Sequence, residues 1–229
     1  MGTTTHRRIL PTYVWEAPVR IWHWIMAIAM VVLAITGYLI GSPPPSTGGE
    51  AYDHFMFGYI RFAHFTAAYV FAVTFVLRVV WAFFGNRYSR EIFLVPLKML
   101  TPSWWGGFIK QTMHYLFLRR EVQPWLGHNP LAMAAMFFMY VLGTVFMICT
   151  GFALYGEGLG MHSWAYTLFS SWVLPLLGYS QNVHTLHHLG MWYLLLFTMV
   201  HLYMVVREDI MSGETVISTM INGWRVPSK

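Results

Sequence analysis

Four long apolar stretches constrain this chain more than any other feature of its sequence. They run from about residue 21 to 40, 55 to 84, 131 to 155 and 186 to 206. A bilayer core is roughly 30 Å thick, so a helix needs about 20 apolar residues to cross it. Backbone polar groups cannot remain unpaired in hydrocarbon, which favours helices for such stretches. We therefore predict an all-α integral membrane protein with a bundle of four transmembrane helices.

The balance of charged and apolar residues agrees with a membrane location. Of the 229 residues, 57% are hydrophobic and only 10% are charged, whereas about a quarter of the residues in a soluble domain are charged. The length suits one compact bundle, so we predict a single membrane domain over residues 1–229. No cleavable signal peptide is expected, because the N-terminal segment is polar and basic and no small-residue cleavage site follows the first apolar stretch.

The basic residues of the loops predict the orientation of the bundle. Lys and Arg occur in the N-terminal segment, between the second and third stretches, and at the C-terminus, whereas residues 41–59 and 156–183 contain none. Cytoplasmic loops carry an excess of Lys and Arg, so both termini should be cytoplasmic. This distribution accounts for the formal charge of +5, and no nucleic-acid partner is expected.

Two shorter apolar segments, residues 104–118 and 164–177, are expected to lie in the membrane interface. The first contains Lys110 and is too polar to cross, and the second is short and contains Pro175. Both begin with tryptophan, a residue that favours the depth of the lipid headgroups. A fifth span would also place loop charges on the wrong side of the membrane.

Four histidines inside the predicted spans indicate the chemistry of the chain. Ionisable residues in a span are costly and mark functional sites. His23 and His201 fall near the cytoplasmic side, and His64 and His187 near the outer side. His187 and His201 are fourteen residues apart, so they share one face of a helix and lie about 21 Å apart. This arrangement predicts two haem sites, each with two imidazole ligands and no open position on the iron, which favours electron transfer.

The single cysteine, Cys149, restricts the type of cofactor. One cysteine cannot hold an iron–sulfur cluster or a zinc ribbon, and it cannot form the Cys-x-x-Cys-His attachment of c-type haem. The expected cofactor is therefore haem b, held by ligation and packing. His184 and His188 flank His187, so which of these imidazoles binds is left open.

Several motifs, taken together, resemble one known family. They occur in this order: Tyr-Val-Trp-Glu-Ala-Pro-Val-Arg-Ile-Trp-His-Trp (13–24), Gly-Tyr-Ile-Arg-Phe-Ala-His-Phe (58–65), Gly-Asn-Arg-Tyr-Ser-Arg-Glu (85–91), Gly-His-Asn-Pro-Leu-Ala (127–132), His-His-Leu-Gly-Met-Trp (187–192), Arg-Glu-Asp-Ile-Met-Ser (207–212) and Val-Ile-Ser-Thr-Met-Ile-Asn-Gly (216–223). From about residue 13 to 224 the chain is similar to the b-type cytochrome subunit of membrane-bound nickel–iron uptake hydrogenases.

The resemblance implies a role and a set of partners in the inner membrane of a bacterium. The chain would anchor an iron–sulfur small subunit, whose C-terminal transmembrane helix packs against the bundle, and a nickel–iron large subunit. It would bind one or two haems b, the outer one held by His64 and His187 and the inner one by His23 and His201. Electrons would pass from the small subunit to a quinone, while the hydrogen chemistry takes place on the partner subunits. No catalytic residue for that chemistry is expected in this chain, although quinone reduction could occur on it.

Further polar residues are expected to serve the haems and the quinone. Arg61 and Arg78 of the second span are suitable partners for haem propionates, and Arg78 could equally mark the inner headgroup boundary. The residues expected at a quinone site beside the inner haem open the third span or close the fourth: His128, Asn129, Arg207 and Glu208. Capping and headgroup contacts are the alternative roles of these four residues.

Two other functions are compatible with parts of the pattern. A related cytochrome b that serves a formate or thiosulfate enzyme would share the bundle and the histidine pairs. A metal-ion transporter without haem fits less well, because transporters place carboxylates near the midplane and none of the four stretches contains Asp or Glu. A purely structural anchor would not need paired histidines at matched depths.

Overall fold

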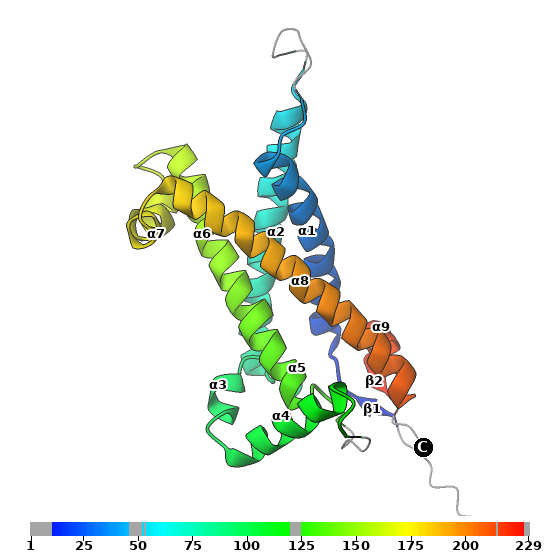
Figure 1. Cartoon of the computed structure of the whole chain (residues 1–229). Helices are drawn as coiled ribbons and strands as arrows, with labels where there is room; N and C mark the ends of the chain where they lie inside the picture. The colour runs from blue at the N-terminus through cyan, green and yellow to red at the C-terminus, as the bar shows by residue number, and fades with distance from the viewer. Residues whose placement is uncertain (1–10, 46–51, 53, 120–124, 214, 227–229) are drawn as a thin grey trace, which may run out of the picture. The chain divides into compact units, whose positions relative to one another are not determined.

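Four long helices make up most of the structure, a computed structural model that describes residues 11–45, 52, 54–119, 125–213 and 215–226 (Figure 1). They are α1 (Ala17–Gly41), α2 (Met56–Phe84), the continuous helix formed by α5 (Pro130–Ala135), η1 (Met136–Val141) and α6 (Leu142–Leu159), and α8 (Ser180–Ser212). Each is long and apolar enough to cross a membrane. The predicted all-α architecture with four spanning helices is confirmed.

The helices extend beyond the predicted spans at most of their ends. The fourth was predicted over residues 186–206 and is helical over Ser180–Ser212. Hydropathy detects only the part of a helix that suits hydrocarbon, whereas hydrogen bonding continues into polar residues such as His184 and Glu208. The predicted cytoplasmic position of the termini remains a prediction. Part of its basis, the charges of Arg7, Arg8, Glu50, Asp53, Arg120 and Lys229, lies outside the described residues.

The shorter elements occupy the connections and the two ends of the chain. They are β1 (Thr12–Tyr13), α3 (Val95–Lys98), α4 (Pro102–Tyr115), η2 (Tyr166–Ser170), α7 (Ser171–Leu177), α9 (Val216–Asn222) and β2 (Trp224–Arg225). The two segments expected in the interface are α4 and the pair η2–α7. On α4, Trp104 and Gln111 are buried while Trp105, Ile109 and Met113 are exposed, an arrangement suited to a helix that lies in the membrane interface.

The chain divides into two compact units. The span unit comprises residues 22–80 and 136–198, and the terminal unit comprises residues 1–21, 81–135 and 199–229. Each of the four long helices contributes residues to both units. The expectation of a single domain remains a prediction.

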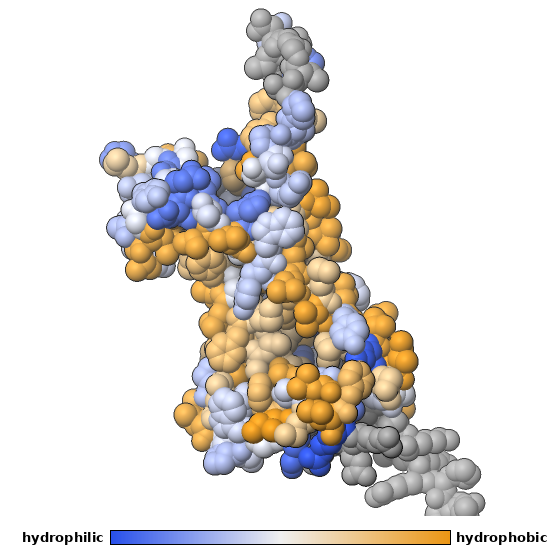
Figure 2. All heavy atoms as spheres, viewed as in Figure 1, coloured by the Kyte–Doolittle hydropathy of each residue, from blue (hydrophilic) through white to orange (hydrophobic). Residues whose placement is uncertain are grey.

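Aromatic contacts and close helix approaches hold the span unit together. Phe65 of α2 packs edge to face on Tyr155 of α6, with 5.1 Å between ring centroids. The Thr198 hydroxyl of α8 lies 3.2 Å from the Met30 sulfur of α1. Apolar side chains such as Ile28 remain exposed, and apolar residues cover much of the visible surface of the long helices (Figure 2). A lipid-facing surface has this composition because no water contacts it.

The third spanning helix changes its winding in the middle. Residues Met136–Val141 are π-helical, and a π segment frees carbonyl groups from the regular helical ladder. The Tyr193 hydroxyl of α8 donates a hydrogen bond of 3.3 Å to the Phe138 carbonyl. The Tyr140 ring stacks on Phe197 of α8, with 5.6 Å between centroids. The π segment thus directs two contacts toward α8.

A short sheet in the terminal unit joins segments from the two ends of the chain. Strands β1 and β2 pair antiparallel, with Thr12 opposite Arg225 and Tyr13 opposite Trp224. The Val14 amide donates to the Gly223 carbonyl at 2.9 Å. Gly223 has a φ of 87°, and a Cβ there would collide with the Trp15 carbonyl oxygen, so this turn requires glycine.

The Glu16 carboxylate connects the sheet to the end of α2. It accepts hydrogen bonds from the Trp81 indole at 3.0 Å and from the Asn86 backbone amide at 2.9 Å. The Asn86 side-chain amide in turn donates to the Val14 carbonyl at 2.9 Å. Residues of two sequence motifs, 13–24 and 85–91, therefore meet here. In the structure, Glu16 and Asn86 connect these two segments through hydrogen bonds.

Candidate functional site

Two of the span histidines make matching hydrogen bonds to threonines of neighbouring helices. His64 Nδ1 of α2 lies 2.9 Å from Thr36 Oγ1 of α1. His187 Nδ1 of α8 lies 2.8 Å from Thr150 Oγ1 of α6. The two imidazoles are also close enough to interact electrostatically. These are the two histidines that the sequence places together near the outer side.

The threonine hydroxyls determine which ring nitrogen of each histidine carries the proton. A hydroxyl has one hydrogen to donate, and Thr36 donates it to the Val32 carbonyl at 2.6 Å. Thr150 donates in the same way to the Phe146 carbonyl at 2.8 Å. Each hydroxyl oxygen is then left to accept a hydrogen bond from an Nδ1–H group.

The opposite nitrogen of each ring is available to bind a metal. Within the described part of the chain, Nε2 of neither His64 nor His187 makes a hydrogen bond. With the proton on Nδ1, Nε2 keeps its lone pair, and a neutral imidazole in this form is a common metal ligand. The donor set of this site therefore fits a metal held between two neutral imidazoles.

A glycine follows each of the two threonines and lies against the corresponding histidine. A Cβ on Gly37 would lie 3.4 Å from His64 Cε1, and a Cβ on Gly151 would lie 3.1 Å from His187 Cε1. A Cβ on Gly151 would therefore crowd the His187 ring, whereas a Cβ on Gly37 would make an ordinary van der Waals contact with the His64 ring. The two threonines are not among the predicted site residues, although both Thr-Gly dipeptides are visible in the sequence inside predicted spans.

His187 has different neighbours from its flanking histidines, His184 and His188. His188 Nδ1 lies 2.8 Å from the position of a Cβ on Gly41, and its ring packs edge to face on Trp192. His184 Nδ1 lies 3.1 Å from the Ser180 carbonyl oxygen. Of the three, His187 is therefore the one whose Nδ1 meets a threonine hydroxyl.

The predicted inner histidines belong to different units of the chain. His23 lies in the span unit, is half-buried, and packs edge to face on Trp24 with 5.2 Å between centroids. His201 lies in the terminal unit on α8 and is half-buried. Their pairing remains a prediction from the sequence.

The two arginines of α2 have different surroundings. The exposed Arg61 guanidinium lies over the Phe65 ring, 5.7 Å from its centroid. Arg78 is only 7% exposed and interacts electrostatically with Tyr140. A buried arginine in a span is costly unless another group compensates its charge, so Arg78 is the more constrained of the two.

A polar cluster in the terminal unit is centred on Tyr115. Asn129 Nδ2 donates a hydrogen bond of 3.0 Å to the Tyr115 hydroxyl, which in turn donates to Glu208 Oε2 over 3.5 Å. The Arg207 guanidinium lies over the Tyr115 ring, 4.9 Å from its centroid. We call these four residues the Tyr115 cluster. It contains three of the four residues predicted for a quinone site, together with one that was not predicted.

Local structure fixes the orientation of the Asn129 amide. Its Oδ1 accepts a hydrogen bond of 2.8 Å from the Ala132 amide, so Asn129 caps the N-terminus of α5 in the usual manner, with Pro130 as the first helical residue. Since Oδ1 is used in this cap, Nδ2 is the atom that faces Tyr115.

The Tyr115 hydroxyl stays protonated at neutral pH. Burial raises the pKa of Tyr115, and the negative charge of Glu208 raises it further, while hydrogen bonds with Gln111 and Asn129 and the charge of Arg207 oppose this shift. The phenol can therefore act as a hydrogen-bond donor and as a relay for a proton.

The fourth residue predicted for the quinone site, His128, has other neighbours. Its backbone amide donates to Glu91 Oε2 at 3.0 Å, and its Nδ1 lies 3.5 Å from the same oxygen. Its ring packs against Trp15, with 5.0 Å between centroids. His128 thus lies beside Glu91 and beside Trp15, which follows β1.

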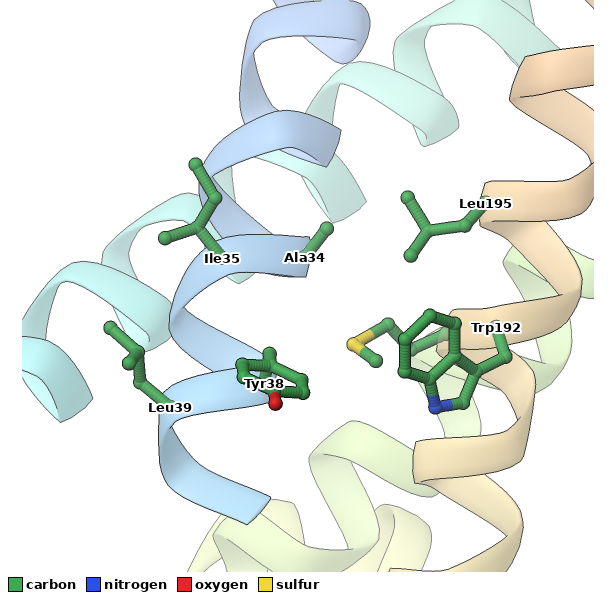
Figure 3. A pocket seen from close by; sticks show the side chains of 7 residues that line it. Ala34, Ile35, Tyr38, Leu39, Trp192 and Leu195 are labelled. Atoms are coloured by element: carbon green, nitrogen blue, oxygen red, sulfur yellow. The ribbon is translucent and has the colours of Figure 1, made fainter. Parts of the chain in front are cut away.

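An apolar groove of about 340 Å³ opens between α1 and α8 of the span unit (Figure 3). It is lined by Ala34, Ile35, Tyr38, Leu39, Met191, Trp192 and Leu195. The Tyr38 and Trp192 rings meet edge to face, with 6.4 Å between centroids. No imidazole lines the groove, so it is distinct from the contacts of His64 and His187.

Comparison with known proteins identifies the family. The family profile described as prokaryotic cytochrome b561 matches residues 14–223. The chain belongs to this cytochrome b561 family. It is 55% identical over 225 residues to the "Probable Ni/Fe-hydrogenase B-type cytochrome subunit" of Azotobacter vinelandii, which covers 98% of this chain and 92% of that protein.

Two further relatives carry closely similar names. The protein of that name from Cupriavidus necator is 54% identical over 219 residues, covering 96% of this chain and 88% of that protein. The "Probable Ni/Fe-hydrogenase 1 B-type cytochrome subunit" of Escherichia coli K12 is 50% identical over 223 residues, covering 95% of this chain and 92% of that protein. The resemblance inferred from the motifs is confirmed.

Membership in the cytochrome b561 family establishes the cofactor class and the location. Haem b and electron transport follow from the family, as predicted. With four helices able to span a bilayer, the chain is a multi-pass protein of the bacterial inner membrane. Among the described residues, no three His, Cys, Asp or Glu side chains gather as a metal-ion site. The His64 and His187 imidazoles each present the neutral nitrogen donor that a haem iron binds.

Proposed function

We propose that this cytochrome b561-family chain is the membrane and electron-transfer subunit of a nickel–iron hydrogenase that faces the periplasm. The observation that carries the proposal is the pair of bonds to Thr36 and Thr150, which leave His64 Nε2 and His187 Nε2 as lone-pair donors. The names of the relatives from Azotobacter vinelandii and Escherichia coli supply the hydrogenase context.

His64 and His187 would hold the outer haem, each through its Nε2 atom. Haem b, when bound, would supply one-electron chemistry. A second, inner haem is assigned to His23 and His201. Arg61 and Arg78 of α2 are the partners for propionate groups, and the burial of Arg78 favours it for a charge inside the bundle.

The Tyr115 cluster is the quinone site. Reduction of a quinone to a quinol consumes two electrons and two protons. The Tyr115 hydroxyl accepts a hydrogen bond from Asn129 Nδ2 and donates its one hydrogen to Glu208 Oε2. When a quinone binds, this hydrogen turns from Glu208 to a quinone oxygen, and the Glu208 carboxylate then relays the replacement proton to Tyr115. The Arg207 guanidinium, stacked on the same ring, stabilises negative charge that develops on the quinone.

The partners are an iron–sulfur small subunit with a C-terminal transmembrane helix and a nickel–iron large subunit. Oxidation of hydrogen on the large subunit releases two protons and two electrons outside. The electrons cross this chain to the quinone, which takes its protons from the cytoplasm. Charge separation across the membrane therefore accompanies each turnover.

The first test is a reduced-minus-oxidised visible spectrum of the purified chain in mild detergent, with haem quantified per chain. We expect a b-type spectrum and two haems per chain. His64→Ala and His187→Ala should each lose the outer haem and keep the inner one. His23→Ala and His201→Ala should each lose the inner haem and keep the outer one. If all four variants retain two haems, the ligand assignment is wrong.

The partner is tested by affinity purification of the complex from membranes, followed by metal analysis. Nickel that co-purifies with the chain in stoichiometric amounts, together with hydrogen-dependent reduction of the haem, supports the hydrogenase assignment. A molybdenum-containing partner would instead assign the chain to a formate or thiosulfate type of oxidoreductase.

A further inference from the structure

We propose that Thr36 and Thr150 are matched positioning residues that hold the two outer haem ligands in the tautomer able to bind iron. The inference rests on the proposed haem site of His64 and His187. It assigns a role to residues on α1 and α6 that would not themselves touch the iron. Each is followed by a glycine, and the two Thr-Gly pairs repeat one arrangement on two different helices.

The repeated geometry is the main support for this role. The distances from Nδ1 to Oγ1 are 2.9 Å for His64 and 2.8 Å for His187. Thr36 is 8% exposed and Thr150 is 1% exposed, so water does not compete strongly for either hydroxyl. One histidine follows its threonine through the α1–α2 connection and the other through the α6–α8 connection, so two independent parts of the chain form the same contact.

Other threonines show that helix geometry alone does not produce this contact. Thr112, Thr185 and Thr198 also donate to the carbonyl four residues earlier, at 2.9, 3.0 and 2.9 Å. Back-bonding of this kind is common for threonine in helices. Of these five threonines, only Thr36 and Thr150 have a hydroxyl that additionally meets a histidine ring nitrogen.

The chemistry of the hydroxyl explains how it selects the ligand form. A hydroxyl that already donates its hydrogen can only accept at its oxygen, and the donated bond strengthens that acceptor. It therefore favours the tautomer with the proton on Nδ1. The other tautomer would present N–H at Nε2, which cannot bind iron, and would place two acceptors against each other at Nδ1.

The glycines complete the arrangement by leaving room for the rings beside the helix backbone. A Cβ on Gly151 would lie 3.1 Å from His187 Cε1, and a Cβ on Gly37 would lie 3.4 Å from His64 Cε1. The threonine holds one edge of each ring and the glycine backbone lies beside it. Together they set the rotation of the imidazole as well as its protonation.

The test compares Thr36→Val and Thr150→Val with Thr36→Ser and Thr150→Ser in the full-length chain. Valine keeps the shape but removes the acceptor, while serine keeps the hydroxyl. Loss of a hydrogen bond behind a metal ligand typically weakens metal binding about 10- to 100-fold, so we expect haem to dissociate at least about tenfold faster from the valine variants. Thr198→Val is the matched control, because Thr198 makes the same backbone bond without meeting a histidine.

Two spectroscopic readouts separate positioning from general destabilisation. The low-spin ferric EPR signal of the outer haem should shift in the valine variants, since the imidazole is free to rotate. The midpoint potential of that haem should rise, because an imidazole without a hydrogen-bond acceptor at Nδ1 is less basic and stabilises ferric iron less. The serine variants should return both values to those of the unmodified chain.

The outcomes discriminate this inference from the proposed function. Dissociation rates within twofold of the Thr198→Val control, with unchanged EPR and potential, would overturn the role of the threonines. Serine variants that lose haem as fast as the valine variants would also overturn it, because the hydroxyl would then be irrelevant. If valine variants cannot be isolated, serine against alanine at the same positions gives the same comparison. Retention of the outer haem in both His64→Ala and His187→Ala would instead reject the haem site itself.

Discussion

The histidine pair of the span unit and the Tyr115 cluster of the terminal unit satisfy their polar groups in opposite ways. Each histidine has one neutral partner on the adjacent helix, Thr36 or Thr150. Tyr115 instead contacts several groups at once, including an amide, a carboxylate and a guanidinium. In hydrocarbon each added charge must be compensated locally, so a membrane span favours simple neutral pairs. A multi-residue charged network belongs where headgroups and water are near.

The difference also corresponds to different chemical tasks under the proposed function. None of the four predicted spans contains Asp or Glu, so the spans themselves offer the electron-carrying site no carboxylate to exchange protons. The Tyr115 cluster includes Glu208, and its phenol is protonated at neutral pH because burial and that carboxylate raise the pKa of Tyr115. Electron transfer and proton transfer are thus assigned to chemically distinct sites.

The largest expected effect comes from removing a histidine of the span unit. His187→Ala should eliminate the outer haem completely, halving the haem-to-chain ratio, because no second ligand replaces it. A quinone analogue should still bind to the Tyr115 cluster with unchanged affinity, measured by fluorescence or calorimetric titration. Loss of both properties in a folded variant would show that the two sites are not independent.

A smaller but clear effect is expected for Tyr115→Phe. One hydrogen bond to the quinone is worth about 1–1.5 kcal/mol, which corresponds to about a tenfold change in rate. Quinone reduction should therefore slow about tenfold, while the haem spectrum and haem content stay the same. Tyr203→Phe is a suitable control, because Tyr203 is 62% exposed, and an equal effect in the control would contradict the assignment.

Glu16→Gln should weaken the terminal unit without altering the histidine pair. Hydrogen bonds to a charged acceptor contribute about 1.5–3 kcal/mol, and Glu16 accepts two, from Trp81 and Asn86. We expect faster proteolysis within residues 81–135 and an unchanged haem spectrum. Glu157→Gln, whose carboxylate makes one exposed hydrogen bond to Ser180, should have almost no effect on either.

The smallest expected effect distinguishes the two glycines. Gly151→Ala should shift the EPR signal of the outer haem more than Gly37→Ala, because the added Cβ would lie 3.1 Å rather than 3.4 Å from the ring. Both substitutions should leave haem content intact, since alanine favours a helix over glycine by up to about 1 kcal/mol. Equal shifts, or a larger one at Gly37, would show that these contacts do not control ring orientation.

The fold and the histidine pair could be predicted because membrane spans have a strong signal in the sequence. Long apolar stretches define the helices, and an ionisable residue such as His64 or His187 stands out within them. Thr36 and Thr150 could not be found in the same way. Threonine is uncharged, and its hydroxyl can always be satisfied by its own helix, so its presence in a span indicates nothing about a ligand.

The Tyr115 cluster was predicted in part for a related reason. Asn129, Arg207 and Glu208 lie at the ends of predicted spans, where a polar site beside the inner haem was expected. Tyr115 lies in α4, a segment expected only to rest in the interface. Its partners Asn129 and Glu208 are 14 and 93 residues away in the sequence. Periodicity and composition carry no information about contacts over such separations.

The pairing of β1 with β2 also sets an order of events during synthesis. All four spanning helices are translated after β1 and before β2, so this sheet closes only when the last of them has already been delivered to the bilayer. The span unit, which ends at residue 198, can fold while β2 is still inside the ribosome. The terminal unit cannot, because Thr12 has no strand to pair with until Arg225 emerges. Closure of the sheet therefore requires that all four spanning helices have already been synthesised.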